Sequence, residues 1–330
     1  MYMLNKWQHK LPTLLVAALL SACGGGGGGG GSTTTPPVIN PPVVNPPSTS
    51  CAVSPTGLPG ATGDTAIDGF NWFNYRRADI GLAMLTCNEQ LNKAAVGHSN
   101  YLRLNNTVSH DQVAGNPGFT GAALADRLTA SGYTLGGSYA YGEVISAATD
   151  RAGFYHAEEL IAAIYHRFVI FEPMFREMGT GASTASGSYT YFTADMATRN
   201  GFGTGLGKGK IVAYPKDGQT AIPTTFDSDT ESPDPVPNVN RVGYPISVHS
   251  DITGNVTVTS FTVRPRGGAQ MSTRLLTSAT DQHTPVHAAA IVPLSTLTSN
   301  TTYDVTFSGT VDSVARDKKL VIYDKITSRP

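Results

Sequence analysis

Residues 91–110, LNKAAVGHSNYLRLNNTVSH, decide the fold together with the segments that follow them as far as Met196. Small or apolar side chains recur there at the spacing of one helix face, at Leu91, Ala94, Ala95, His98 and Leu102. The pattern predicts helix from Asp68 to Asn106, in two pieces. A later helix ends in IYHRF at 164–168, and short strands are expected near 178–182 and 189–196. The order predicts an α+β fold in which helices cover a small sheet.

Three separated segments each carry one polar side chain suited to proton handling or metal ligation: His110, Glu143 and His166. Two imidazoles and one carboxylate suit Zn²⁺ or a similar cation with a water in the open position. Without a metal, the carboxylate would orient an imidazole and raise its pKa. The spacings of 33 and 23 residues match no local metal motif, so only the fold could unite the three. The alternative is unrelated surface histidines, with His166 and Arg167 serving as cations at a helix end.

Several features of the sequence occur in an order that resembles the CAP superfamily. They are HSNYLRLNNTVSHDQ (98–112), DRLTASGY (126–133), the Gly142-Glu143 pair, a helix-terminal His-Arg and an aromatic strand. This family includes cysteine-rich secretory proteins, antigen 5 and pathogenesis-related proteins, with an SCP-like bacterial branch. The resemblance covers about Trp72 to Ala197. It implies a CAP-type α-β-α sandwich with a central antiparallel sheet.

The resemblance also implies a cleft in which two histidines and two acids can hold a divalent cation. His110 corresponds to the histidine of the Ser-His motif, Glu143 to the glutamate of the Gly-Glu-Asn motif, and His166 to the histidine of the bacterial His-Arg motif. Val144 stands where that family has asparagine, and its second histidine motif ahead of the strand is absent. A three-residue metal site of the bacterial kind is therefore the expectation, without firm catalytic residues.

Further side chains are candidates for ligand binding: His98, Asp111, Tyr133 and Tyr141. His98 falls on the packed helix face, so it is either a core histidine with a satisfied ring nitrogen or a residue at the cleft edge. Asp111 is the spare acid beside His110. The tyrosines would line the cleft, although core tyrosines would give the same pattern. Arg127, next to Asp126, is interpreted as a solvated or local ion pair.

The first 50 residues are interpreted as an export signal followed by a flexible tether. Residues 1–23 have a basic start, a short apolar run and Leu20-Ser21-Ala22-Cys23, which resembles a bacterial lipobox with Cys23 lipidated. The alternative is an ordinary cleaved secretory peptide. Residues 24–50 contain eight glycines followed by Pro pairs, a composition that cannot bury a core. We expect a lipid-anchored protein of the cell envelope, at the outer membrane.

Two more cysteines, Cys51 and Cys87, would be free to pair as a disulfide in an oxidising compartment, and two buried thiols are the alternative. Charged residues make up only 14% of the chain and the formal net charge is −1. Without a basic stretch, nucleic acid is not an expected partner.

The predicted domains are an SCP-like CAP domain over 51–206 and an all-β Ig-like sandwich over 207–330. From Ile211 onward, short alternating runs such as NVTVTSFTVRP (255–265) and TTYDVTFSGTV (301–311) are typical of antiparallel strands. The run GFGTGLGKGK (201–210) is interpreted as an interdomain linker, because no Ser or Thr follows Lys208 and no helix follows the glycines.

Three functions fit these observations. The first is a binding module whose cleft takes a small, lipid-like, sterol-like or cell-wall ligand, modulated by a divalent cation. The second is a metal-assisted hydrolase in which His110, Glu143 and His166 hold a water and Glu143 acts as general base. The third is a structural adhesin. The absence of a recognisable nucleophile–base motif favours the first.

Overall fold

The computed structural model describes residues 57–323. The predicted signal peptide, Cys23, the tether and Cys51 lie outside these residues. Within the described range, no helix has both the length and the hydropathy needed to cross a bilayer.

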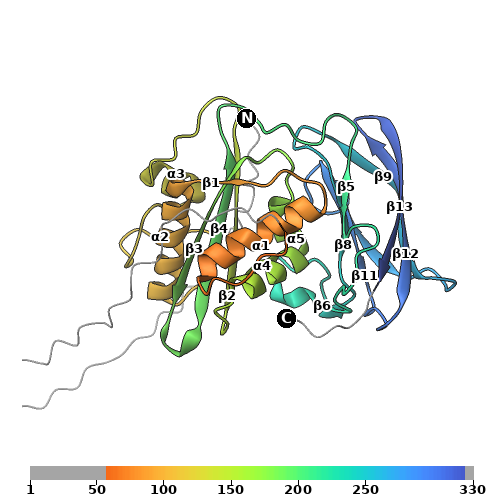
Figure 1. Cartoon of the computed structure of the whole chain (residues 1–330), viewed down its shortest axis with the longest axis horizontal. Helices are drawn as coiled ribbons and strands as arrows, with labels where there is room; N and C mark the ends of the chain where they lie inside the picture. Colours follow the sequence, from red (N-terminus) through yellow and green to blue (C-terminus); the bar gives the residue numbers. More distant parts are fainter. Residues whose placement is uncertain (1–56, 324–330) are drawn as a thin grey trace, which may run out of the picture. The chain divides into compact units, whose positions relative to one another are not determined.

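The first half of the described chain is an α-β-α sandwich, as predicted (Figure 1). One sheet has the order β1-β3-β4-β2, with β1 parallel to β3 and the other pairs antiparallel. Helices α2 and α3 cover one face of the sheet and α1, α4 and α5 the other. The elements are α1 (Thr65–Asp79), β1 (Thr86–Cys87), α2 (Glu89–Asn105), α3 (Leu124–Ala130), β2 (Ala140–Ala148), α4 (Gly153–Ala162), α5 (Ile164–Ile170), β3 (Glu177–Thr184), η1 (Ser186–Ser188) and β4 (Thr190–Thr198).

Local capping explains where the first helices start. Asp64 accepts hydrogen bonds from the amides of Ala66 and Ile67, and Asn88 does the same for the amides of Gln90 and Leu91. The predicted break in the first helical stretch is the segment that contains β1. The later helix, predicted as one piece, is two helices, because Ala163 adopts an extended backbone with ψ 115° between α4 and α5.

Helix α2 lies unusually close to β3 because two positions of that strand lack a side chain. A Cβ atom on Gly179 would lie 2.1 Å from the backbone nitrogen of Asn92, and one on Gly181 would lie 2.3 Å from that of Val96. No L-residue fits these distances without moving the helix. The close contact places the α2 side chains, His98 among them, directly over the sheet.

The second half of the described chain is all β, as predicted. Two antiparallel sheets, β10-β11-β8-β5 and β13-β12-β9, are consistent with a β-sandwich. Their inner faces contribute apolar residues such as Phe261, Val305 and Phe307 to the core. The elements are β5 (Val212–Tyr214), β6 (Phe226–Asp227), η2 (Ser228–Thr230), β7 (Arg241–Val242), β8 (Ile246–His249), β9 (Val256–Pro265), β10 (Thr273–Leu276), β11 (Ala288–Pro293), β12 (Thr302–Val311) and β13 (Val314–Tyr323).

One hydrophobic core continues from the first half into the second. It includes Phe171 of the first half and Tyr214 of the second, whose ring centroids are 5.0 Å apart. The buried Arg167 guanidinium lies 4.9 Å from the ring of Tyr214 and 5.0 Å from that of Tyr244. The predicted boundary near residue 206 stays a prediction, but the residues on its two sides are packed together.

The glycine contact between α2 and β3 gives a direct test of the fold. We expect Gly179→Ala to lower the free energy of unfolding by about 1–3 kcal/mol, because the added methyl group meets helix backbone and not a movable side chain. Gly60→Ala is the matched control, since nothing lies within 4 Å of its Cβ position. Urea denaturation of both variants measures the difference. Equal stabilities would contradict the proposed close contact.

Candidate functional site

A buried ion pair lies at the centre of the candidate site. Glu143 on β2 has a side chain that is only 2% exposed, and Arg127 on α3 has one that is 0% exposed. Arg127 Nη2 donates to both carboxylate oxygens of Glu143, at 2.8 Å to Oε1 and 2.7 Å to Oε2. A buried, charge-assisted contact of this kind holds the carboxylate rigidly in place.

His110 is the part of this cluster that reaches the surface. Its Nδ1 lies 2.9 Å from Glu143 Oε1, and its side chain is 51% exposed. Because an ionised carboxylate only accepts, Nδ1 carries the proton and Nε2 is left as an acceptor. The His110 carbonyl accepts a hydrogen bond of 2.8 Å from Arg127 Nη1, so Arg127 also fixes the loop.

His98 is a core histidine, the first of its two predicted interpretations. Its side chain is fully buried, with Nε2 2.9 Å from the Ser109 carbonyl and Nδ1 2.8 Å from Gln112 Nε2. A carbonyl only accepts and an amide nitrogen only donates, so the ring is neutral with its proton on Nε2. By holding Ser109, His98 positions the neighbouring His110 and does not meet a ligand itself.

The pKa values of the cluster agree with this arrangement. Burial alone would raise the pKa of the Glu143 carboxyl, but the charge of Arg127 and the hydrogen bond from His110 hold it below its usual range. Burial lowers the pKa of His98, which keeps that ring neutral near pH 7. Because His98 is neutral, the guanidinium of Arg127 is the permanent positive charge beside Glu143.

A second acid, Asp195 on β4, lies opposite Glu143 in the sheet register. It is 1% exposed, and neither of its carboxylate oxygens accepts a hydrogen bond within the described residues. Burial raises the pKa of Asp195 well above its usual range, and the negative charge of Glu143 adds to this effect. Burial and the neighbouring charge of Glu143 therefore favour the protonated form of the Asp195 carboxyl.

The structure brings His110 and Glu143 together but places His166 elsewhere, which corrects the predicted three-residue metal site. His166 Nδ1 lies 3.0 Å from Glu231 Oε1. Glu231, in the second half of the chain, also accepts from the amides of Ile164, Tyr165 and His166 at 2.8, 2.7 and 3.2 Å. The carboxylate thus caps the start of α5, so His166 is not a cation at a helix C-terminus. Arg167 does serve at a helix end, because its guanidinium donates to the carbonyls of Ile161 and Ala162 in the last turn of α4.

The side chains present do not fit a divalent cation at Glu143. Arg127 already occupies both oxygens of its carboxylate. Among residues 57–323, no group of three or more His, Cys, Asp or Glu side chains is arranged to hold a metal ion. The cation implied by the family resemblance therefore has no set of ligands here.

The remaining candidates divide between core and surface. Tyr133 is 0% and Tyr141 5% exposed, and both pack in a core cluster with Leu91 and Leu128. Their predicted place in a ligand cleft is therefore wrong, and Tyr133 OH donates to Glu177 at 2.6 Å. Asp111 is exposed next to His110 in the sequence, and its part in ligand binding stays a prediction. Asp126 caps the amide of Ala123.

Cys87 lies on β1, with its sulfur 3.3 Å from Asn92 Nδ2. Its predicted partner Cys51 is outside the described residues, so the disulfide stays a prediction.

Two important residues were missed by sequence reasoning. Arg127 is interpreted from the sequence as part of a solvated or local ion pair, but it is buried and donates to Glu143, 16 residues away. Asp195 could have been found, because a single acid within the apolar strand YTYFTADMA is the usual sign of a buried, partnered carboxyl.

The loop that carries His110 exposes apolar side chains. Val108 is 56%, Val113 63% and Phe119 39% exposed. Tyr101 OH fixes this loop by accepting from the Val113 amide at 2.9 Å. Leu104, Val108, Val113 and Phe119 are exposed apolar residues within nine positions of His110 in the sequence, and we refer to them as the apolar rim of His110.

The protonated Asp195 predicts a pH dependence of stability. Because its pKa is raised on folding, the folded protein keeps a proton that the unfolded chain releases above about pH 4. Stability should therefore fall as the pH rises, by about 1.4 kcal/mol per unit while Asp195 stays protonated. Asp195→Asn has nearly the same shape and removes the titration, so we expect the stability of the variant relative to that of the wild type to rise between pH 5 and pH 7. Urea denaturation at several pH values measures the two curves, and parallel curves would contradict a buried protonated acid.

The ligand geometry also predicts how the protein responds to zinc. With His166 held by Glu231 and Glu143 by Arg127, we expect excess Zn²⁺ to change the Tm of the wild type and of His110→Ala equally. Thermal unfolding with Zn²⁺ and with a chelator measures this. A zinc-dependent rise in Tm that disappears in His110→Ala would show that a metal site exists after all.

One family model matches part of this chain. Residues 70–196 match the family model described as CAP, the cysteine-rich secretory protein family. Among solved structures, an extracellular protein containing an SCP domain from Bacillus anthracis is 24% identical with a TM-score of 0.33, over 41% of this chain and 40% of that one. An outer surface protein from Borrelia burgdorferi is 13% identical with a TM-score of 0.33, over 40% of this chain and 90% of that one. No curated protein matches. The α-β-α sandwich within residues 70–196 is therefore a CAP domain.

Proposed function

We propose that this chain is an exported protein, anchored at the cell surface through a lipid on Cys23, whose CAP domain binds a small lipid-like molecule beside His110 without converting it. The export signal and the tether are inferred from the sequence of residues 1–50. The observation that carries the binding proposal is the half-exposed His110 within its apolar rim.

His110 is prepared to recognise one polar group of the ligand. Glu143 holds its Nδ1, so Nε2 points away from the carboxylate as a hydrogen-bond acceptor. The loop is fixed at three positions, because His98 holds Ser109, Arg127 holds the His110 carbonyl and Tyr101 holds Val113. A rigid acceptor loses little conformational freedom when a ligand binds.

The apolar rim supplies the second half of the recognition. All four of its side chains lie within nine residues of His110 in the sequence and are more than a third exposed. Covering such side chains with a hydrocarbon chain removes apolar surface from water, at about 25 cal/mol per Å². A molecule with one polar head and an apolar tail satisfies both the histidine and the rim.

The hydrolase alternative is less well supported. Glu143 is a weak base, because both of its oxygens are bound by Arg127 and its pKa is lowered. His166, the expected third ligand of the metal that would activate a water, is held by Glu231 instead.

Binding of a fluorescent long-chain alcohol, whose hydroxyl can donate to Nε2 of His110, to the full chain tests the proposal. We expect saturable binding by the wild type and about tenfold weaker binding by Val113→Asp and Phe119→Asp, because each change places a charge where the tail lies. His110→Ala should weaken binding by a similar factor. The bound molecule, recovered and weighed by mass spectrometry, should be unchanged.

Val286→Asp is the matched control, since Val286 is 48% exposed in the second half of the chain. Equal affinities in all variants, or the absence of saturable binding, would contradict a site at His110. Conversion of the bound molecule that is lost in Glu143→Gln would favour the enzyme instead.

A further inference from the structure

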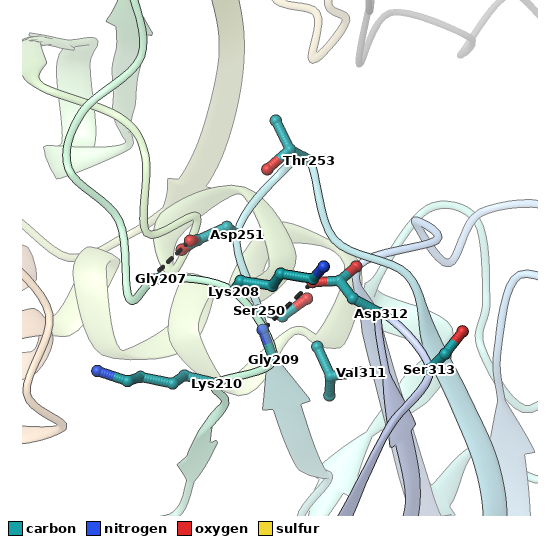
Figure 2. Close-up of a pocket in the computed structure, with 10 residues that line it drawn as sticks. All are labelled: Gly207, Lys208, Gly209, Lys210, Ser250, Asp251, Thr253, Val311, Asp312 and Ser313. Carbon is teal, nitrogen blue, oxygen red and sulfur yellow. Dashed lines mark hydrogen bonds between the residues drawn. The ribbon is translucent and has the colours of Figure 1, made fainter.

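A cavity lies in the C-terminal part of the chain. Its volume is about 490 Å³, within the range of small-molecule sites. Figure 2 shows its walls, which come from the glycine-rich loop at Gly207–Lys210, the segment after β8 and the turn between β12 and β13. None of these residues takes part in the His110 site.

The glycine-rich loop cannot bind phosphate through its backbone, because carboxylates of the same chain already occupy its amides. Asp251 accepts from the amides of Leu206 and Gly207 at 2.6 and 2.9 Å. Asp312 accepts from the amide of Gly209 at 3.3 Å and from that of Asn255 at 3.0 Å. The loop is therefore a support for two carboxylates and not an anion cradle.

The lining favours a neutral, hydroxyl-rich ligand. Two lysines, Lys208 and Lys210, balance the two aspartates, so the cavity has no excess charge for an isolated ion. Val311 is the one aliphatic side chain among the residues that line the cavity, so the cavity offers little apolar surface to a lipid tail. Carboxylates accept and ammonium groups donate, and a sugar hydroxyl does both.

The turn between β12 and β13 gives an independent indication of function. Val311 pairs with Val314, so only Asp312 and Ser313 connect the strands, and their φ angles are 52° and 65°. Two-residue turns of this geometry favour Asn-Gly or Asp-Gly, because a left-handed conformation costs most residues about 1–2 kcal/mol. Ser313 keeps a strained position and at the same time lines the cavity. Strain retained at one spot is a common feature of functional sites.

Lys208 is available for a ligand. Within residues 57–323 its Nζ makes no ion pair or hydrogen bond, and its side chain is exposed at the cavity. In Figure 2 its side chain extends across the cavity on the side of Asp312.

From these observations we infer that this cavity is a binding site for a neutral mono- or disaccharide, held by Lys208, Asp251, Asp312 and Ser313. This saccharide site is distinct from the site for a lipid-like ligand proposed in the CAP domain, and the inference does not depend on that proposal.

Calorimetric titration of the full chain with glucose, N-acetylglucosamine, galactose and maltose tests the site, with glucose 6-phosphate as the anionic comparison. We expect saturable binding of at least one neutral sugar, about tenfold weaker in Lys208→Ala because a charge-assisted hydrogen bond is lost. Ser313→Gly should raise the Tm, since glycine relieves the turn, and should weaken sugar binding. A purely structural turn would show only the first effect.

Lys319→Ala, an exposed lysine on β13 that does not line the cavity, is the matched control and should bind as the wild type does. The inference is overturned if no neutral sugar binds, if binding is unchanged in Lys208→Ala and Ser313→Gly, or if glucose 6-phosphate binds more tightly than every neutral sugar. None of these results depends on the behaviour of the His110 site.

Discussion

The contact between Arg127 and Glu143 is the interaction on which the candidate site depends. A carboxylate buried in a sheet is costly unless a cation accompanies it, and Arg127 supplies that cation from α3. With Glu143 ionised and immobile, His110 is oriented, Asp195 retains its proton, and the His110 carbonyl is fixed by the same guanidinium. An internal guanidinium thus takes the position in which the family resemblance led us to expect a metal ion.

The sequence predicted the architecture well, since helical spacing near Leu91 and strand patterns near 178–182 and 189–196 are local signals. The proximity of His110 and Glu143 came from the family resemblance. Arg127 and Asp195 were not identified, because their roles depend on neighbours that only the sheet register and the packing of α3 bring close.

The prediction for His166 was wrong because its partner also lies far away in the sequence. Its position in a His-Arg pair matched a family pattern, but its partner Glu231 is 65 residues away, in a segment predicted to be a separate module. No spacing rule indicates that a distant carboxylate will cap α5. Tyr133 and Tyr141 were likewise ambiguous, since lining and core tyrosines share one sequence pattern, and the α2–α3 core decided between them.

The capping of α5 by Glu231 has a consequence for how such a chain can evolve. A CAP domain that had lost its downstream half would leave the amides of Ile164, Tyr165 and His166 without their acceptor, and Arg167 without its two tyrosine rings. Recombination at the junction would therefore yield a damaged remainder, whichever half was removed. The two halves of this polypeptide are expected to be inherited as a single unit.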